Sequence, residues 1–151
     1  MPKTIVADSS CLILFYKIGE LELLKKVFGR IVITETVSRE FNKPLPEWIE
    51  VVEPKSELYF GLQSILDLGE ASSIALASEN KETLLIIDEL KGRRVARKLD
   101  ISITGSLGVL VVAKNRGYIK TVKPIIDKIV STNFRISDDL VQRILTRVNE
   151  L

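Results

Sequence analysis

Two stretches decide the fold: Thr4-Ile5-Val6-Ala7-Asp8 at the start of the chain and Leu84-Leu85-Ile86-Ile87-Asp88 in its middle. Each is a short run of apolar, mostly branched residues, which is typical of a β-strand, and each ends in an aspartate. In a parallel α/β sheet the carboxyl ends of the strands form the crevice where ligands bind. Two carboxylates delivered there repel each other unless a cation lies between them. The two stretches therefore predict a parallel sheet with a hard-metal site at one end.

Strand-like and helical patterns alternate along the rest of the chain. Residues 30–33, 48–52 and 101–104 are expected to form further strands. Helices are expected at residues 9–16, 20–28, 34–41, 106–115 and 124–131, near Gly69, after Ile87, and after a cap at Ser137. This alternation predicts an α/β fold with a central parallel sheet, helices on both faces and right-handed crossovers.

The composition is that of an ordinary soluble protein. With 151 residues, 46% apolar and 28% charged, the chain is expected to form one domain over residues 1–151 that buries roughly 68–70% of its unfolded surface. No apolar run approaches the ~20 residues that cross a bilayer, so no membrane partner is expected. The first residues leave no room for a signal peptide. A single cysteine excludes an internal disulfide, and a cytoplasmic location is expected.

Two absences narrow the chemistry. The chain has no histidine, which excludes Ser-His-Asp and Cys-His triads and histidine acid–base catalysis. Cys11 is the lone cysteine, so the usual zinc sites are excluded as well. A metal must therefore be held by oxygen ligands, which favours Mg²⁺ or Mn²⁺ as the cofactor.

Glu40 and Glu70 are candidates to join the two aspartates. Asp8 could simply cap the helix that follows it, and Asp88 and Glu70 could occupy first helical turns, where an anion is favoured. Glu40 has no such explanation, because it falls in the last turn of its predicted helix, where the helix dipole disfavours an anion. Taken together, the four acids are interpreted as one shared metal site.

A basic segment follows Asp88 directly. Its cations are Lys91, Arg93, Arg94, Arg97 and Lys98. They could do no more than line the solvated face of a helix. Lys91, Arg93 and Arg94 are expected to lie close enough to Asp88 to touch a phosphate near the site, so an acidic site beside a basic segment could hold a metal and a polyanion together.

Six segments stand in a characteristic order along the chain: Val6-Ala7-Asp8-Ser9-Ser10, Val37-Ser38-Arg39-Glu40-Phe41, Leu68-Gly69-Glu70-Ala71 with Ile74-Ala75-Leu76-Ala77, Leu85-Ile86-Ile87-Asp88, Gly92-Arg93-Arg94-Val95-Ala96 and Thr104-Gly105-Ser106-Leu107-Gly108-Val109-Leu110. Their order and spacing resemble the PIN-domain nuclease family, in a prokaryotic branch related to VapC-type toxins. The resemblance covers essentially the whole chain.

The resemblance implies a three-layer α/β/α sandwich and Mg²⁺- or Mn²⁺-dependent cleavage of RNA. It assigns the family's four acidic positions, catalytic and metal-binding, to Asp8, Glu40, Glu70 and Asp88. Ser10 corresponds to a small hydroxyl residue that supports the first aspartate, and Glu89 stands where relatives often carry a second aspartate. Relatives usually form homodimers, and a toxin would also need a small antitoxin partner.

Two other classes of function stay open from the sequence. A catalytically silent relative would keep the fold and bind nucleic acid or protein as a regulator; tight metal binding without turnover would favour it. A phospho-accepting signalling domain also has a strand-end aspartate, but its second acid near the first strand is missing, because Ser9 and Ser10 follow Asp8.

Overall fold

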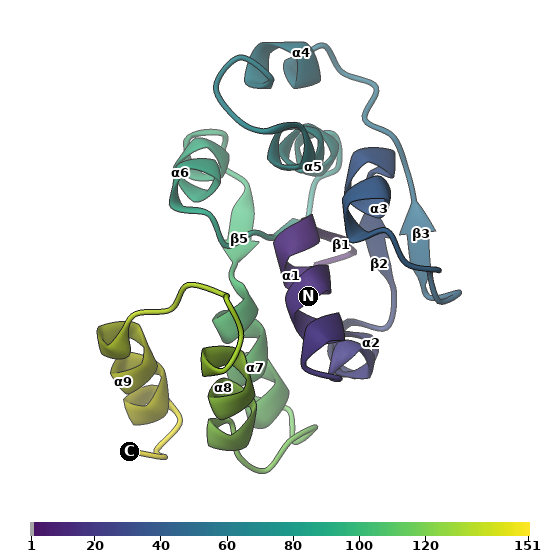
Figure 1. The fold of residues 1–151 in the computed structure, drawn as a ribbon. Helices are drawn as coiled ribbons and strands as arrows, with labels where there is room; N and C mark the ends of the chain where they lie inside the picture. The colour runs from purple at the N-terminus through teal and green to yellow at the C-terminus, as the bar shows by residue number, and fades with distance from the viewer. Residues whose placement is uncertain (1) are drawn as a thin grey trace.

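A computed structural model describes residues 2–151 as a three-layer α/β/α sandwich around a five-stranded, all-parallel sheet (Figure 1). The strands lie in the order β3-β2-β1-β4-β5. They are β1 (Thr4–Ala7), β2 (Ile31–Ile33), β3 (Ile49–Val51), β4 (Thr83–Ile86) and β5 (Ser102–Thr104). The expected fold class is confirmed, and every expected strand is present within one or two residues of its predicted ends.

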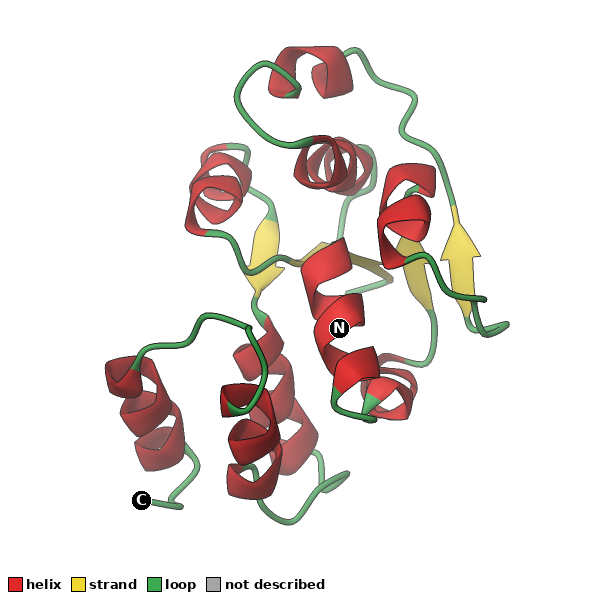
Figure 2. Ribbon diagram, viewed as in Figure 1, coloured by secondary structure: helices red, strands yellow, loops and turns green. Residues whose placement is uncertain are grey.

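The helices cover both faces of this sheet (Figure 2). They are α1 (Ser9–Lys17), α2 (Leu21–Phe28), α3 (Glu35–Phe41), α4 (Leu58–Leu62), α5 (Leu68–Ser78), α6 (Leu90–Lys98), α7 (Ser106–Asn115), α8 (Lys123–Val130) and α9 (Asp138–Arg147). Only α4 was not expected. Thr34 caps α3 as predicted, because its hydroxyl accepts a hydrogen bond from the Val37 backbone N–H at 3.1 Å.

Successive side chains of a β-strand point to opposite faces of the sheet, so the sheet divides the core into two clusters. Ile5 and Ala7 of β1 point toward the cluster built with α1, α2 and α7, whereas Val6 points toward the cluster built with α4, α5 and α6. Because both faces are covered, the central strands are apolar throughout instead of alternating with polar residues. This explains why the sequence of β1 and β4 reads as unbroken apolar runs.

The strand order creates a topological switch point between β1 and β4. From β1 the chain crosses to β2 on one side, and from β4 it crosses to β5 on the other. Ligands of open α/β sheets bind in the crevice outside such a point. Because Ala7 is paired with Ile86, Asp8 and Asp88 both emerge at this crevice.

The last two helices pack against α7 and complete one layer (Figure 1). Leu145 and Val148 are buried in the core on this side, while Leu140 and Ile144 pack against it. The apolar side of the C-terminal helix therefore faces the protein. In α6, Gly92 and Ala96 face inward, whereas Leu99, which follows the last residue of the helix, is 39% exposed.

No helix among residues 2–151 is long and apolar enough to cross a membrane.

Candidate active site

Asp88 is held at the switch point by hydroxyl and backbone donors. Its Oδ1 accepts the Ser106 backbone N–H at 2.7 Å, and its Oδ2 accepts the hydroxyls of Ser106 at 2.7 Å and of Ser10 at 3.2 Å. The Ser106 N–H opens α7, so Asp88 satisfies a free donor at the positive end of that helix. The alternative that Asp88 lies in the first turn of α6 is wrong, since the helix begins at Leu90 and Glu89 is its N-cap residue. Ser10 supports this aspartate, whereas the resemblance implied support for the first one.

Asp8 is the buried acid of the pair. It precedes α1 in cap geometry, but its carboxylate makes no capping hydrogen bond to the helix. The Ser73 hydroxyl reaches its Oδ1 only at 3.5 Å. Burial is the largest cause that raises the pKa of Asp8 to about 7; the Ser9 backbone N–H opposes this rise, and the charges of Asp67, Glu40 and Asp88 add to it. A buried carboxylate that four groups perturb in this way is typical of a functional site.

Glu70 lies in the first turn of α5 beside an acid that the sequence did not single out. Asp67 caps α5 by accepting the Glu70 backbone N–H at 2.9 Å. The pKa of Glu70 is raised to about 9, first by burial, then by a hydrogen bond between its side chain and Asp67, and further by the charges of Asp67, Asp8 and Glu89. Burial and the neighbouring acids therefore favour the protonated form of the Glu70 carboxyl group.

Glu40 reaches the acidic group from the far side of α5. Its carboxylate lies so close to Gly69 that a Cβ at that position would overlap it. The two helices are joined by a 2.8 Å hydrogen bond between the hydroxyls of Thr34 and Ser72, and this bond fixes α3 against α5. Glu40 is exposed and contributes its charge to the surroundings of Asp8, but it does not line the cleft described next.

A cleft of about 990 Å³ opens at the switch point. Its acidic end is lined by Asp8, Asp67, Glu70, Asp88 and Glu89. From there it continues along α6 and α7 to α9, where its lining is basic and apolar. Three of the four predicted acids, together with Ser10 and Glu89, thus share one cavity.

The basic side of the cleft differs from the sequence-based expectation. Arg93 lines the cleft, as expected, and its guanidinium donates to the Ile87 carbonyl oxygen at 2.7 Å. Lys91 and Arg94 are exposed and do not line the cleft. Arg97 does line it, because residues four apart share a helix face.

Sequence reasoning also missed Asp67, Arg135, Arg143 and Arg147 in the cleft lining. A signal existed for Asp67, which precedes a helix and is followed three residues later by a glutamate, a typical capping pattern. Arg143 and Arg147 are four residues apart, which predicts a shared face. Nothing in the sequence indicates that this face lines the same cleft as α6 and α7.

The donors of this site fit a hard divalent cation in their chemistry. Within the described part of the chain, no three acidic or cysteine side chains form a group ready to hold a metal ion. The available donors are carboxylate and hydroxyl oxygens, which Mg²⁺ and Mn²⁺ prefer. Burial is the main cause that raises the pKa values of Asp8 and Glu70, and the charges of neighbouring acids add to it; a bound cation would offset that negative charge. Cation binding therefore requires these side chains to turn toward one another.

A parallel sheet with carboxylates gathered at its switch point defines an α/β protein with an acidic site. A family model named DUF3368, described as a PIN domain, matches residues 4–150. This chain belongs to the PIN-domain family and has a nuclease-type fold. No curated protein matches the chain, and no solved structure matches it.

Proposed function

We propose that this protein is a Mg²⁺- or Mn²⁺-dependent endoribonuclease that hydrolyses RNA phosphodiester bonds at the acidic end of the cleft. The observation that carries the proposal is the buried Asp8, whose pKa is raised to about 7 where burial and three further acids act on it. A carboxylate that served only as a helix cap would not be expected to lie buried among like charges without a cationic partner. PIN domains are generally nucleases that use divalent metals, which agrees with this chemistry.

Asp8 and Asp88 are the proposed principal metal ligands, with Glu40 and Glu70 as direct or water-mediated ligands. When bound, the cation lowers the pKa of a water molecule and offsets the charge that develops on the phosphate. Ser10 and Ser106 fix the orientation of the Asp88 carboxylate through the hydrogen bonds given above. Hydrolysis at this site would break the P–O3′ bond and leave a 5′-phosphate and a 3′-hydroxyl, with one water molecule supplying the new phosphate oxygen and the proton of the leaving 3′ oxygen.

Glu89 and Arg93 have supporting roles in this proposal. Glu89 lines the cleft beside Asp88 and adds negative charge near Glu70. Arg93 is fixed by its bond to the Ile87 carbonyl oxygen, so its charge lies beside the acids where a phosphate would bind. Lys91 and Arg94, which were expected to share this role, would act only on RNA that extends over the outer face of α6.

The proposal is tested by incubating purified protein with a panel of labelled RNAs in Mn²⁺, Mg²⁺ or EDTA, beside Asp8→Asn. Cleavage that requires metal and is lost in the variant supports it. An Asp8→Asn protein that cuts as fast as the wild type refutes the assignment.

One observation favours a second candidate, a catalytically silent PIN-domain protein that binds nucleic acid or protein. The acids in the described residues do not converge into a metal-binding group. Tight RNA binding without turnover in either metal would support this alternative.

If the protein is a nuclease, it would act as a stand-alone enzyme or as the toxin of a toxin–antitoxin pair. Co-purification of a small inhibitory protein would support the toxin role. Exposed apolar residues such as Phe60 and Leu68 are candidates for a homodimer interface.

A further inference from the structure

The cleft extends well beyond the acids, and its far part has basic residues on opposite sides. Arg93 and Arg97 lie on α6, Arg143 and Arg147 lie on α9, and Arg135 lies in the connection that precedes α9. In each helix the two arginines are four residues apart and therefore share one face. One face of α6 and one face of α9 thus both contribute positive charge to the lining of the same cavity.

Most of these arginines have no partner in the protein. Within residues 2–151, the guanidinium groups of Arg97, Arg135 and Arg147 form no hydrogen bond or ion pair. Arg143 forms only a solvent-exposed pair with Asp139 at 3.1 Å. Such exposed pairs contribute little to stability, so an incoming anion can compete for the Arg143 guanidinium.

Like charges also crowd one another on α6. The pKa of Arg93 is lowered, first by burial and then by the charge of Arg97, while Asp88 opposes this change. Bringing guanidinium groups together without neutralising partners costs free energy. A phosphate between them offsets that cost, since arginine binds phosphate through paired hydrogen bonds.

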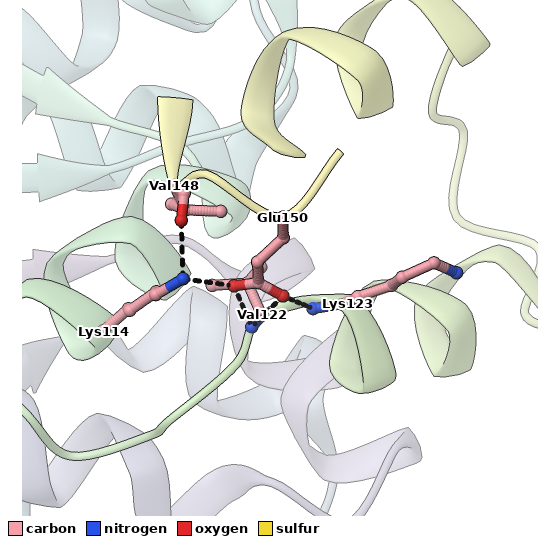
Figure 3. A network of polar contacts seen from close by, with 5 residues as sticks. All are labelled: Lys114, Val122, Lys123, Val148 and Glu150. Atoms are coloured by element: carbon pink, nitrogen blue, oxygen red, sulfur yellow. Dashed lines mark hydrogen bonds and ion pairs between the residues drawn. The ribbon is translucent and has the colours of Figure 1, made fainter. Parts of the chain in front are cut away.

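The α9 wall is held in place by a network at the end of the chain (Figure 3). The Glu150 carboxylate accepts the Val122 backbone N–H at 2.7 Å, the Lys123 backbone N–H at 2.9 Å and the Lys114 ammonium at 2.8 Å. Lys114 also donates to the Val148 carbonyl oxygen at 2.5 Å. These bonds join the end of α9 to the last turn of α7 and the first turn of α8, so the arginines of α9 are positioned before any ligand binds.

Apolar side chains line the same cleft. Leu107 and Val111 of α7 are buried beneath it, whereas the half-buried Phe134 and Ile144 present apolar surface to it. An apolar and aromatic surface suits bases that are not stacked within a duplex. A duplex offers only its phosphates, because its bases are paired and stacked inside.

We propose that the arginines of α6 and α9 form the two walls of a groove for single-stranded nucleic acid, with Arg97, Arg143 and Arg147 as phosphate-binding residues. One strand passes between the walls, its bases lie on the apolar floor, and its backbone leads to the acidic end. This inference rests on the proposed nuclease function for the direction of the strand, but the binding groove itself does not depend on catalysis.

The test measures binding in EDTA, where metal-dependent cleavage cannot occur. Fluorescence anisotropy follows the binding of a short labelled single-stranded RNA without self-complementarity, and of the same RNA annealed to its complement. The test variant is Arg143→Gln/Arg147→Gln. The matched control is Lys25→Gln/Lys26→Gln, which also removes two exposed helical charges but from α2, whose residues do not line the cleft. Thermal unfolding checks that both variants fold.

The α9 variant is expected to bind single-stranded RNA about tenfold or more weakly than the control, and the slope of log K against log salt is expected to fall by about 1.4, since each phosphate contact contributes about 0.7. The wild type is expected to prefer the single strand over the duplex. Equal affinities of the two folded variants for single-stranded RNA, or a preference of the wild type for the duplex, would refute the proposed single-strand groove.

A readout of cleavage separates this inference from the proposed function. A wild type that binds single strands through α9 but cuts nothing in Mn²⁺ would retain the groove and reject the nuclease. A wild type that cuts while the α9 variant cuts and binds equally well would retain the nuclease and reject the groove.

Discussion

Replacing Asp8 with asparagine should stabilise the protein at alkaline pH. In the folded state the pKa of Asp8 is raised from 3.8 to about 7, so at pH 8 the wild type must ionise a carboxyl group that its surroundings disfavour. The difference of about three pH units, at about 1.4 kcal/mol for each, corresponds to about 4 kcal/mol of lost stability. Asparagine has the same shape without the charge. Because it also accepts the Ser9 N–H less strongly, about 2–4 kcal/mol is the expected gain.

The sign of the effect sets its pH dependence. A carboxyl group with a raised folded-state pKa binds more protons in the folded than in the unfolded chain, so wild-type stability falls as pH rises from about 4 to about 7. The asparagine variant lacks this contribution. The difference between the two proteins should be near zero at about pH 4, grow with pH, and stay constant above about pH 7. Glu70, whose pKa is raised to about 9, affects both proteins; burial and Asp67, which are its larger causes, remain in the variant and cancel, and only the smaller part due to the Asp8 charge enters the difference.

Urea unfolding in EDTA, followed by circular dichroism at several pH values, measures this difference. The control is Asp127→Asn, which removes an exposed carboxylate in a surface ion pair with Lys123 and should change stability by less than about 1 kcal/mol at every pH. If Asp8→Asn is destabilised at alkaline pH, or gains the same amount at every pH, then the buried charge assigned to Asp8 is wrong.

Three further substitutions test how the site and the groove are held. Glu150→Gln should cost about 1–2 kcal/mol of stability at neutral pH, measured by urea unfolding, because it weakens hydrogen bonds to a charged acceptor. The pKa of Glu150 is lowered because its hydrogen bonds with Lys114, Val122 and Lys123 outweigh burial. The cost should therefore disappear as pH falls below about 4.5. Gly92→Ala should cost about 1–3 kcal/mol by thermal unfolding and slow RNA cleavage, because a Cβ there would lie 2.7 Å from Ile87 Cδ1 and 2.9 Å from Glu70 Oε1; unchanged stability and cleavage would contradict this packing. Ser106→Ala removes the 2.7 Å hydroxyl bond to Asp88 and should cost about 1 kcal/mol and weaken Mn²⁺ binding in a calorimetric titration; Ser102→Ala, at an exposed position of β5, should do neither.

The fold was predictable because its local signals agree with one another. The runs at β1 and β4 are apolar throughout, as expected for strands covered on both faces, and each ends in an aspartate. Since parallel strands present their carboxyl ends together, Asp8 and Asp88 could be brought together without a structure. The short helix α4 was missed because its five residues, which include a glycine, give too little periodicity to recognise.

The far wall of the cleft was not predictable from pattern alone. Arg143 and Arg147 lie far along the chain from Asp88, and their place in the lining of the cleft depends on how α9 is held beside α7 and α8. Glu150 helps to hold it through hydrogen bonds with Lys114 of α7 and with Val122 and Lys123 at the start of α8, and these contacts have no periodic signature in the sequence. The position of Glu40 outside the cleft lining likewise depends on the contact between α3 and α5, which is a property of the folded structure.

The most direct test of the central claim is an analysis of the ends of RNA cut by wild-type protein in Mn²⁺, beside the Asp8→Asn and Asp88→Asn variants prepared in the same way. We predict 5′-phosphate and 3′-hydroxyl ends, formed only with metal and lost in both variants. Cleavage that persists in EDTA or in the variants, or fragments ending in a 2′,3′-cyclic phosphate, would contradict hydrolysis at the carboxylates of this site.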